Sequence, residues 1–246
     1  MRGMTPLKTL HADADLSRRL ERAEAQANLD FVEARARAFP ERGAEWTGEQ
    51  GTFALFDGID SPLTQTFGLG MAGPVSADGF ERIEALFERK GAPTLHEVSP
   101  LADPSTLNRL NERGYEPFEF TSILYRPSSG APPVERPEGR VAVRITSSNE
   151  VEHWAAVSAR GWASEARELG DFMLELGRVS AQRASAVCFL AEIEGVAVAA
   201  GALAIHEGVA LLAGASTVPE GRRRGAQQAL LAARLQYAAD RGCDVA

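Results

Sequence analysis

The chain has 246 residues, with 26 lysines and arginines against 34 aspartates and glutamates, so its formal net charge is −8. Because the acidic residues are spread along the chain, this balance argues against a nucleic-acid partner, while 44% hydrophobic residues suffice for packed cores. No apolar run approaches the roughly 20 residues of a membrane helix, and the N-terminus lacks a secretory signal core. We therefore expect a cytoplasmic protein without a membrane partner.

The first half begins with a long amphipathic helix over residues 15–39, because apolar residues recur every three or four positions before Pro40. We expect this helix to pack on its own sheet rather than to form a coiled coil. The remaining predicted elements are strands at 51–58 and 63–71, a helix at 76–91 capped by Gly91, a strand at 92–100, a short helix at 103–115 and a final strand or strand pair at 116–127.

A segment rich in proline, glycine and serine, RPSSGAPPVERPEGR, separates this half from the next. It predicts a first domain over residues 1–127, a linker over 128–140 and a second domain over 141–246.

The second half has a similar order of elements. They are a strand at 141–146, helices at 149–164 and 169–183, strands at 186–195, 196–208 and 209–218, a helix at 227–241 capped by Gly242, and the start of a strand at 243–246. Amphipathic helix, basic last turn, glycine and strand follow one another in both 80–98 and 227–246. This repetition indicates an internal duplication, with independent use of a common strand–helix–strand unit as the alternative.

Cysteine and histidine have no spacing typical of a disulfide framework or a zinc site, so we predict no metal. Cys188 lies in the apolar run SAVCFLAEI and is expected to be a core thiol rather than a nucleophile.

Three consecutive arginines occur where a helix begins, in TVPEGRRRGAQQALL at 217–231. The free N–H groups at a helix start already carry partial positive charge, so the cluster predicts a nearby anion. Gly225 removes a Cβ obstruction, and the backbone N–H groups of residues 223–228 are expected to converge on a diphosphate. The arginines would then neutralise the ligand; the alternative is that they extend into water.

This segment resembles the acetyl-CoA-binding motif of the GCN5-related N-acetyltransferases, in which a hydrophobic residue and a proline precede Arg/Gln-x-x-Gly-x-Gly/Ala at a helix start. Val218, Pro219, Arg222 and Gly225 match, whereas Gln227 stands where the family has a small residue. The resemblance covers residues 141–246, with a fainter likeness in the first half. It implies an α/β fold of two tandem mixed-sheet domains like the acyl-CoA N-acyltransferases, the second incomplete at its C-terminus.

The resemblance also implies that acetyl-CoA is a cosubstrate and that an amine of a small molecule or peptide attacks its thioester directly in a ternary complex. A main-chain N–H near Val218 is expected to stabilise the carbonyl oxygen. A non-catalytic module that binds acetyl-CoA, or only protein partners, is the alternative. The expected cofactor-binding residues are Ser216, Thr217, Val218, Arg222, Arg223, Arg224, Gly225, Ala226, Gln227 and Gln228.

The catalytic residues are not assigned from the sequence. Glu192, His206 and Glu207 are the nearby candidate bases, and none of them is selected. The family often uses a tyrosine on a later helix as the acid, and Tyr237 lies on the earlier one.

Three acidic residues, Glu165, Glu168 and Asp171, lie between the first two helices of the second half, where they would favour a cationic amine; a solvated connection explains them equally well. The first-half loop MAGPVSADGF carries Pro74 and no arginine, so we predict that it does not hold the cofactor. A sheet ending at 243–246 is expected to have an open edge, completed in a longer chain, by the first half, or by a second copy in a homodimer.

Overall fold

The computed structural model describes residues 10–128, 141–163 and 170–246. The chain divides into two compact units, a first unit of His11–Tyr125 and a second unit that contains Arg126–Ala246. Apart from residue 128, the predicted linker at 128–140 lies outside the described residues.

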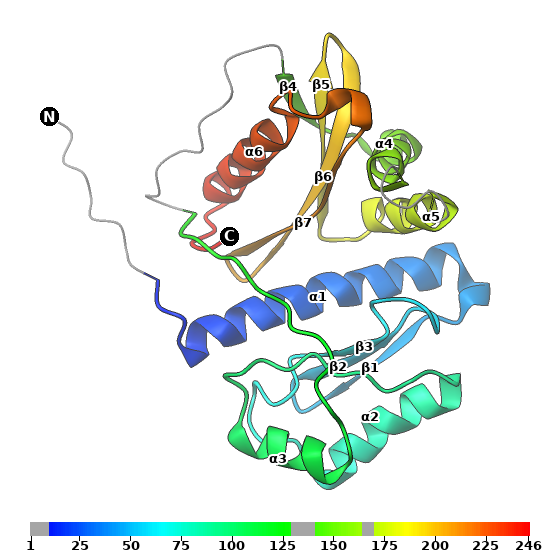
Figure 1. Cartoon of the computed structure of the whole chain (residues 1–246), viewed down its shortest axis with the longest axis vertical. Helices are drawn as coiled ribbons and strands as arrows, with labels where there is room; N and C mark the ends of the chain where they lie inside the picture. Colours follow the sequence, from blue (N-terminus) through cyan, green and yellow to red (C-terminus); the bar gives the residue numbers. More distant parts are fainter. Residues whose placement is uncertain (1–9, 129–140, 164–169) are drawn as a thin grey trace, which may run out of the picture. The chain divides into compact units, whose positions relative to one another are not determined.

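The first unit contains a small antiparallel sheet with strand order β1-β2-β3 and helices on both faces (Figure 1). Its elements are α1 (Ala14–Ala38), a short 3-10 turn (Pro40–Arg42), β1 (Glu45–Glu49), β2 (Thr52–Phe56), β3 (Gln65–Phe67), α2 (Ala77–Lys90) and α3 (Pro104–Glu112).

Helix α1 begins where Asp13 accepts a hydrogen bond from the Leu16 N–H at 2.8 Å. Its residues Ala25, Leu29 and Val32 form a buried cluster with Leu55 of β2 and Phe67 of β3. The prediction that this helix packs on its own sheet is therefore confirmed.

Helix α2 covers the other face of the sheet, where Phe80, Ile83 and Phe87 form a buried cluster with Ala54 and Leu69. After the helix, the chain returns to the sheet in only one place, a parallel bridge between Thr66 and His96. The strand expected at 92–100 is thus reduced to a single bridge.

The final strand or strand pair predicted at 116–127 is wrong for residues 116–125, which form no strand. Phe118, Phe120 and Leu124 are 75%, 91% and 92% exposed. Apolar residues in a β-like pattern form a strand only where a neighbouring strand supplies hydrogen-bond partners, and the pattern alone cannot show that partner. Conversely, β1 was not predicted, because its sequence EWTGE is polar and contains a glycine.

The second unit contains an antiparallel sheet with strand order β4-β5-β6-β7. Its elements are β4 (Val141–Ile145), a short 3-10 turn (Ser148–Glu150), α4 (Val151–Ala163), α5 (Gly170–Ala181), β5 (Ala186–Ile193), β6 (Val196–His206), β7 (Val209–Thr217), a second 3-10 turn (Pro219–Gly221) and α6 (Ala226–Asp240). All of these helices and strands except the short turns match predicted elements.

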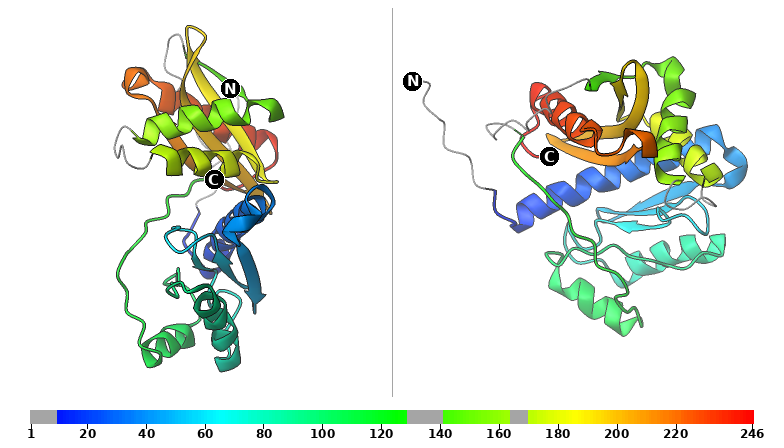
Figure 2. Two further views of the ribbon diagram at one scale, coloured as in Figure 1. Left: turned by 90° about the vertical axis from the view of Figure 1, so that its right-hand side faces the viewer. Right: turned by 45° about the horizontal axis from the view of Figure 1, so that its top comes forward.

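Helix α6 covers one face of this sheet, and α4 and α5 cover the other (Figures 1 and 2). The core combines alanine-rich strands with a few large side chains, among them Trp154, Leu203 and Leu230, each at most 2% exposed. Trp154 Nε1 donates to the Phe189 carbonyl at 3.1 Å, so the indole N–H is satisfied within the core.

The C-terminal residues 244–246 lie between two other segments of this unit. Val245 forms a parallel bridge to Val209 and an antiparallel bridge to Pro127. Arg126 N–H donates to the Ala246 carbonyl at 2.8 Å. Residues 126 and 127, which belong to this unit, therefore supply one neighbour for this segment, and completion of the sheet by a longer chain, the first half or a second copy stays a prediction.

Beyond that bridge, the outer edge of β7 has no strand partner among the residues that the structure describes. The edge is open toward Thr217, which is the end of β7 that leads into the arginine-rich loop.

Candidate cofactor cleft

A cleft of about 610 Å³ lies within the second unit, where β7 ends and α6 begins. Its volume falls within the range of about 300–1,000 Å³ typical of small-molecule sites. All of the predicted cofactor-binding residues except Val218 and Arg224 line it. The complete lining is Gly161, Trp162, Ala215, Ser216, Thr217, Gly221, Arg222, Arg223, Gly225, Ala226, Gln227 and Gln228.

The loop before α6 leaves a run of backbone N–H groups without acceptors. Gly225, at φ +82°, is the N-cap of α6 and offers no side chain to cap it. The first bond of the helix is donated by the Ala229 N–H to the Gly225 carbonyl at 3.0 Å. Among the described residues, no acceptor is found for the N–H groups of residues 223–228. All of these residues except Arg224 line the cleft, and their donors lie at the positive end of the helix dipole.

The three arginines differ in their surroundings. Arg222 Nε donates to the Thr217 carbonyl at 3.3 Å, and its Nη2 donates to the Gly161 carbonyl at 3.4 Å. It thereby ties the last turn of α4 to the end of β7. Arg223, at φ +58°, is exposed and lines the cleft, whereas Arg224 is exposed outside the lining.

Helix α4 reaches the cleft through Gly161, which packs directly against β7. A Cβ on Gly161 would lie 2.5 Å from Ser216 Oγ and 2.9 Å from the Thr217 nitrogen, so only glycine fits. Ser216 is buried, and its hydroxyl donates to the Ser158 carbonyl at 2.9 Å. Sequence reasoning missed Gly161 and the adjacent Trp162. The available signal was a glycine inside a helical pattern, which usually has a packing reason.

The N–H of Val218 itself is not available to stabilise a substrate carbonyl, so the prediction of a main-chain N–H near Val218 has to fall on a neighbouring residue. This N–H donates to the Val198 carbonyl at 3.0 Å, and the residue is 1% exposed. Strand pairing therefore already uses the donor, and Val218 anchors the loop to β6 instead of facing a ligand.

Gln227, the residue that departs from the family motif, joins the end of β7 to the start of α6. Its Nε2 donates to Thr217 Oγ1 at 2.7 Å. The long side chain thus has a partner within the cleft lining.

The pairing of β6 with β7 contains a β-bulge beside the cleft. Ala200 pairs with Ser216 and Ala202 pairs with Ala213, so one residue of β6 faces two residues of β7, Gly214 and Ala215. Gly214 adopts φ +65°, and the next residue lines the cleft.

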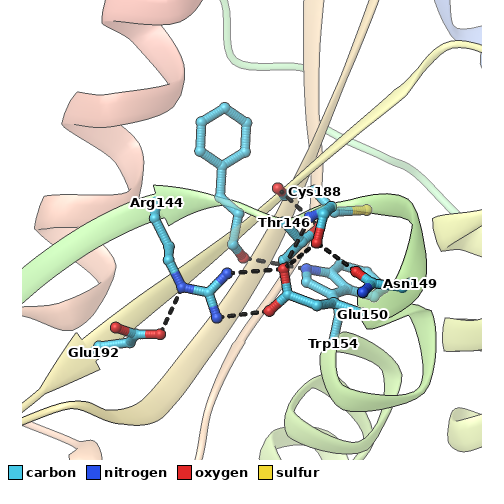
Figure 3. A network of polar contacts seen from close by, with 9 residues as sticks. Arg144, Thr146, Asn149, Glu150, Trp154, Cys188 and Glu192 are labelled. Carbon is cyan, nitrogen blue, oxygen red and sulfur yellow. Dashed lines mark hydrogen bonds and ion pairs between the residues drawn. The ribbon is translucent and has the colours of Figure 1, made fainter.

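None of the candidate bases lines the cleft. Glu192 accepts a 2.7 Å hydrogen bond from Arg144, whose guanidinium also binds Glu150 (Figure 3). Hydrogen bonds from Arg144, followed by those from the backbone and hydroxyl of Ser147, lower the pKa of Glu150 to about 2. His206 and Glu207 lie at the turn that leads into β7, while the cleft lies where β7 ends. The polar network of Figure 3 therefore binds β4 to β5 and is structural.

Cys188 is 6% exposed, and burial raises the pKa of its thiol to about 11. A thiol that stays protonated at neutral pH in the core is a poor nucleophile, so its prediction as a core residue is confirmed.

Of the acidic residues proposed for the acceptor site, Glu165 and Glu168 lie outside the described residues, and Asp171 is in the first turn of α5. Within the described ranges, no group of three or more histidine, cysteine, aspartate or glutamate side chains is arranged to hold a metal ion. The helices of the same ranges include none that combines the length and apolarity needed to span a membrane.

Comparison with known proteins identifies the fold. A solved GCN5-related N-acetyltransferase from Kribbella flavida resembles this chain with a TM-score of 0.63 and 20% identity, over 94% of this chain and 84% of that one. A DUF2156 domain from Agrobacterium fabrum resembles it with a TM-score of 0.51 and 12% identity, over 94% and 76% of the two chains.

A solved aminoglycoside N-acetyltransferase in complex with CoA matches 44% of this chain and 75% of its own at 25% identity, with a TM-score of 0.33. No protein-family model matches the sequence, and neither does any curated protein. On the two matches that span the chain, it has the mixed α/β fold of the GCN5-related N-acetyltransferases. The resemblance stated from the sequence is therefore confirmed for the fold.

Proposed function

We propose that this chain is an N-acetyltransferase that binds acetyl-CoA in the cleft and transfers the acetyl group to an amine of a small molecule or peptide. The observation that carries the proposal is the run of N–H groups at residues 223–228, for which the described part of the chain supplies no acceptor; all of these residues except Arg224 line the cleft. A diphosphate supplies several oxygen acceptors and a negative charge, which the start of a helix favours.

In this proposal the cleft residues divide into three roles. The loop backbone, with Gly225, Ala226, Gln227 and Gln228, binds the diphosphate, and Arg223 and Arg224 are its counter-ions. Ser216 and Thr217 lie along the pantetheine arm at the open edge of β7. Arg222 and the buried Val218 keep the loop in place through the bonds described above.

Acetyl-CoA supplies an activated acetyl group, and the chain's own residues bind and orient it. Holding amine and thioester together supplies much of the rate enhancement, because a bimolecular step becomes effectively unimolecular. The bulge at Gly214 and Ala215 offers backbone at the cleft, and we propose that an N–H of this bulge takes the role expected of a main-chain N–H near Val218.

We propose that residues 1–127 form a tandem domain of the same origin that holds no cofactor. In its corresponding loop, Ser76 Oγ accepts the Gly79 N–H at 3.1 Å, which takes the place that a ligand oxygen would need.

A second candidate, a module that binds acetyl-CoA without catalysing transfer, is favoured by one observation. Glu192 is engaged by Arg144, and the other candidate bases lie away from the cleft. No described carboxylate or imidazole therefore lines the site to deprotonate an incoming ammonium group.

Two measurements test the proposal. Calorimetric titration with CoA and acetyl-CoA tests binding, and release of free thiol from acetyl-CoA across a panel of polyamines, aminoglycosides and peptides tests transfer. Saturable binding with amine-dependent thiol release supports the enzyme. Binding with no release across the panel supports the non-catalytic module, and absence of binding contradicts both.

A further inference from the structure

Helix α6 carries a buried arginine, Arg234, which is 4% exposed. Its Nη1 donates to the Ala202 carbonyl at 3.0 Å, and its Nε donates to the Leu230 carbonyl at 3.4 Å. Among the described residues, no carboxylate lies within ion-pair distance of its guanidinium. Burial lowers the pKa of Arg234 to about 10, so the group remains charged at neutral pH. A buried cation that binds only carbonyl groups costs folding free energy. Its presence therefore indicates that the N–H donors of the guanidinium are needed at this position.

The guanidinium of Arg234 rests on the strand position opposite the bulge. A Cβ on Gly201 would lie 3.3 Å from Arg234 Cζ and 3.4 Å from its Nε. Gly201 pairs with Phe189 on β5, and it is the residue of β6 that faces Gly214 and Ala215 on β7. The arginine therefore packs on the backbone of β6 at the place where the ladder to β7 is interrupted.

The bulge is thus held from both faces of the sheet. On the α6 face, Arg234 packs on Gly201 and binds the next carbonyl, that of Ala202. On the α4 face, the Ser216 hydroxyl binds the Ser158 carbonyl. A bulge bends its strand and redirects the backbone, so contacts on both faces fix the direction in which Ala215 faces the cleft.

We propose that Arg234 is a positioning residue for acetyl transfer: it fixes the bulge of β6 and β7 through Gly201 and Ala202, so that the backbone of Gly214 and Ala215 is directed at the thioester carbonyl. This inference rests on the proposed function. Arg234 forms and breaks no bond in the reaction. An apolar side chain of equal length would fill its volume but would leave the Ala202 carbonyl without its donor.

Three variants test this role. Arg234→Met keeps the length of the side chain and removes its donors, while Arg234→Lys keeps the charge with a different donor geometry. Gly201→Ala leaves the arginine intact but places a methyl group against the guanidinium, so it disturbs the same contact from the other side. Gln236→Met, at an exposed position of the same helix, is the control.

The decisive readout is the NMR resonance of acetyl-CoA labelled with 13C at the thioester carbonyl, because a hydrogen bond to this oxygen moves the resonance downfield. We expect the wild type and the control to shift it on binding, Arg234→Met and Gly201→Ala to lose most of the shift, and Arg234→Lys to keep part of it. Calorimetry should give CoA dissociation constants within about twofold of the wild type in all four variants. With any amine that is acetylated, kcat should fall about tenfold or more in Arg234→Met with KM for acetyl-CoA unchanged.

An unchanged carbonyl resonance in both Arg234→Met and Gly201→Ala overturns the inference and leaves the proposed function intact. Parallel loss of CoA binding and carbonyl shift also overturns it, because the role would then be structural. If Arg234→Met does not fold, Gly201→Ala decides. Failure of the unmodified protein to bind CoA contradicts the proposed function itself, and is seen before any variant is compared.

Discussion

The starts of α2 and α6 occupy equivalent places in the two units and treat their backbone N–H groups in opposite ways. Each helix follows a strand, ends at a left-handed glycine, Gly91 or Gly242, and leads to a parallel bridge with the preceding strand. At the start of α2, Ser76 accepts the Gly79 N–H. At the start of α6, Gly225 supplies no cap, and the N–H groups open on a cleft.

Under the proposed function, a shared topology leaves ligand binding undecided, and the residue at the N-cap distinguishes the two loops. A serine cap satisfies the helix start internally, whereas a left-handed glycine exposes the donors to an anion. The two loops also differ in their positively charged residues. Residues 71–80 contain no arginine, while Arg222, Arg223 and Arg224 precede α6.

Gly225→Asp should have the largest effect, because it removes the difference between the capped N–H groups of α2 and the free N–H groups of α6. The substitution adds a Cβ at φ +82° and a negative charge beside the free N–H groups. Calorimetry should show CoA affinity reduced by more than about 100-fold, or about 2.7 kcal/mol. The matched control is Gly91→Asp, at the left-handed glycine of the first unit, which should bind CoA normally. Wild-type affinity in a folded Gly225→Asp protein would count against the diphosphate site.

The double variant Arg223→Ala, Arg224→Ala should weaken CoA binding by about 10- to 30-fold, because charge-assisted contacts to phosphate are lost. It should also flatten the dependence of affinity on salt, measured by calorimetry at several ionic strengths. The control removes two exposed arginines of α2, Arg82 and Arg89, and should change neither quantity. Equal losses in the two double variants would mean that net charge, rather than the loop, attracts the ligand.

Glu21→Gln should change the stability of the first unit without involving the CoA site predicted in the second unit. Burial raises the pKa of Glu21 from 4.5 to about 7, with further contributions from Glu97 and Glu24. Because the folded state holds this proton more tightly than the unfolded state, stability should fall as pH rises from about 4.5 to about 7. Denaturant unfolding at pH 8 should find the variant more stable by about 1–2 kcal/mol, with the gain absent at pH 4. An equal gain in unfolding free energy at both pH values would show that the raised pKa of Glu21 is not its cause.

Ser76→Ala should have the smallest effect. Loss of the cap of α2 should cost about 1 kcal/mol of unfolding free energy, measured by denaturant titration. CoA affinity should stay unchanged, because the predicted site is in the other unit. A fall in CoA affinity with this variant would show that the first-unit loop takes part in binding.

The sequence was most informative where structure depends on neighbouring residues. The glycine after each of α2 and α6 was predicted as a cap, and both Gly91 and Gly242 adopt left-handed φ. The predicted stop of α1 before Pro40 likewise agrees with its end at Ala38. These signals are local, since a cap is fixed by hydrogen bonds within one or two turns.

Sequence reasoning failed where the answer depends on distant partners. The segment at 116–125 has no strand partner among the described residues, and Val218, predicted as a cofactor-binding residue, is buried with its N–H bound to the Val198 carbonyl. Gly161 reaches the cleft only because α4 packs on a strand more than fifty residues later in the chain. Register and helix packing decide these contacts, and neither can be read from one segment.

The most direct test of the central claim is a titration of the 15N-labelled protein with CoA, followed through the backbone amide resonances. A diphosphate site at the start of α6 predicts saturable shifts for the amides of residues 223–228, and none for the amides at the start of α2. CoA that binds and leaves the resonances of residues 223–228 unmoved, while others shift, would contradict it.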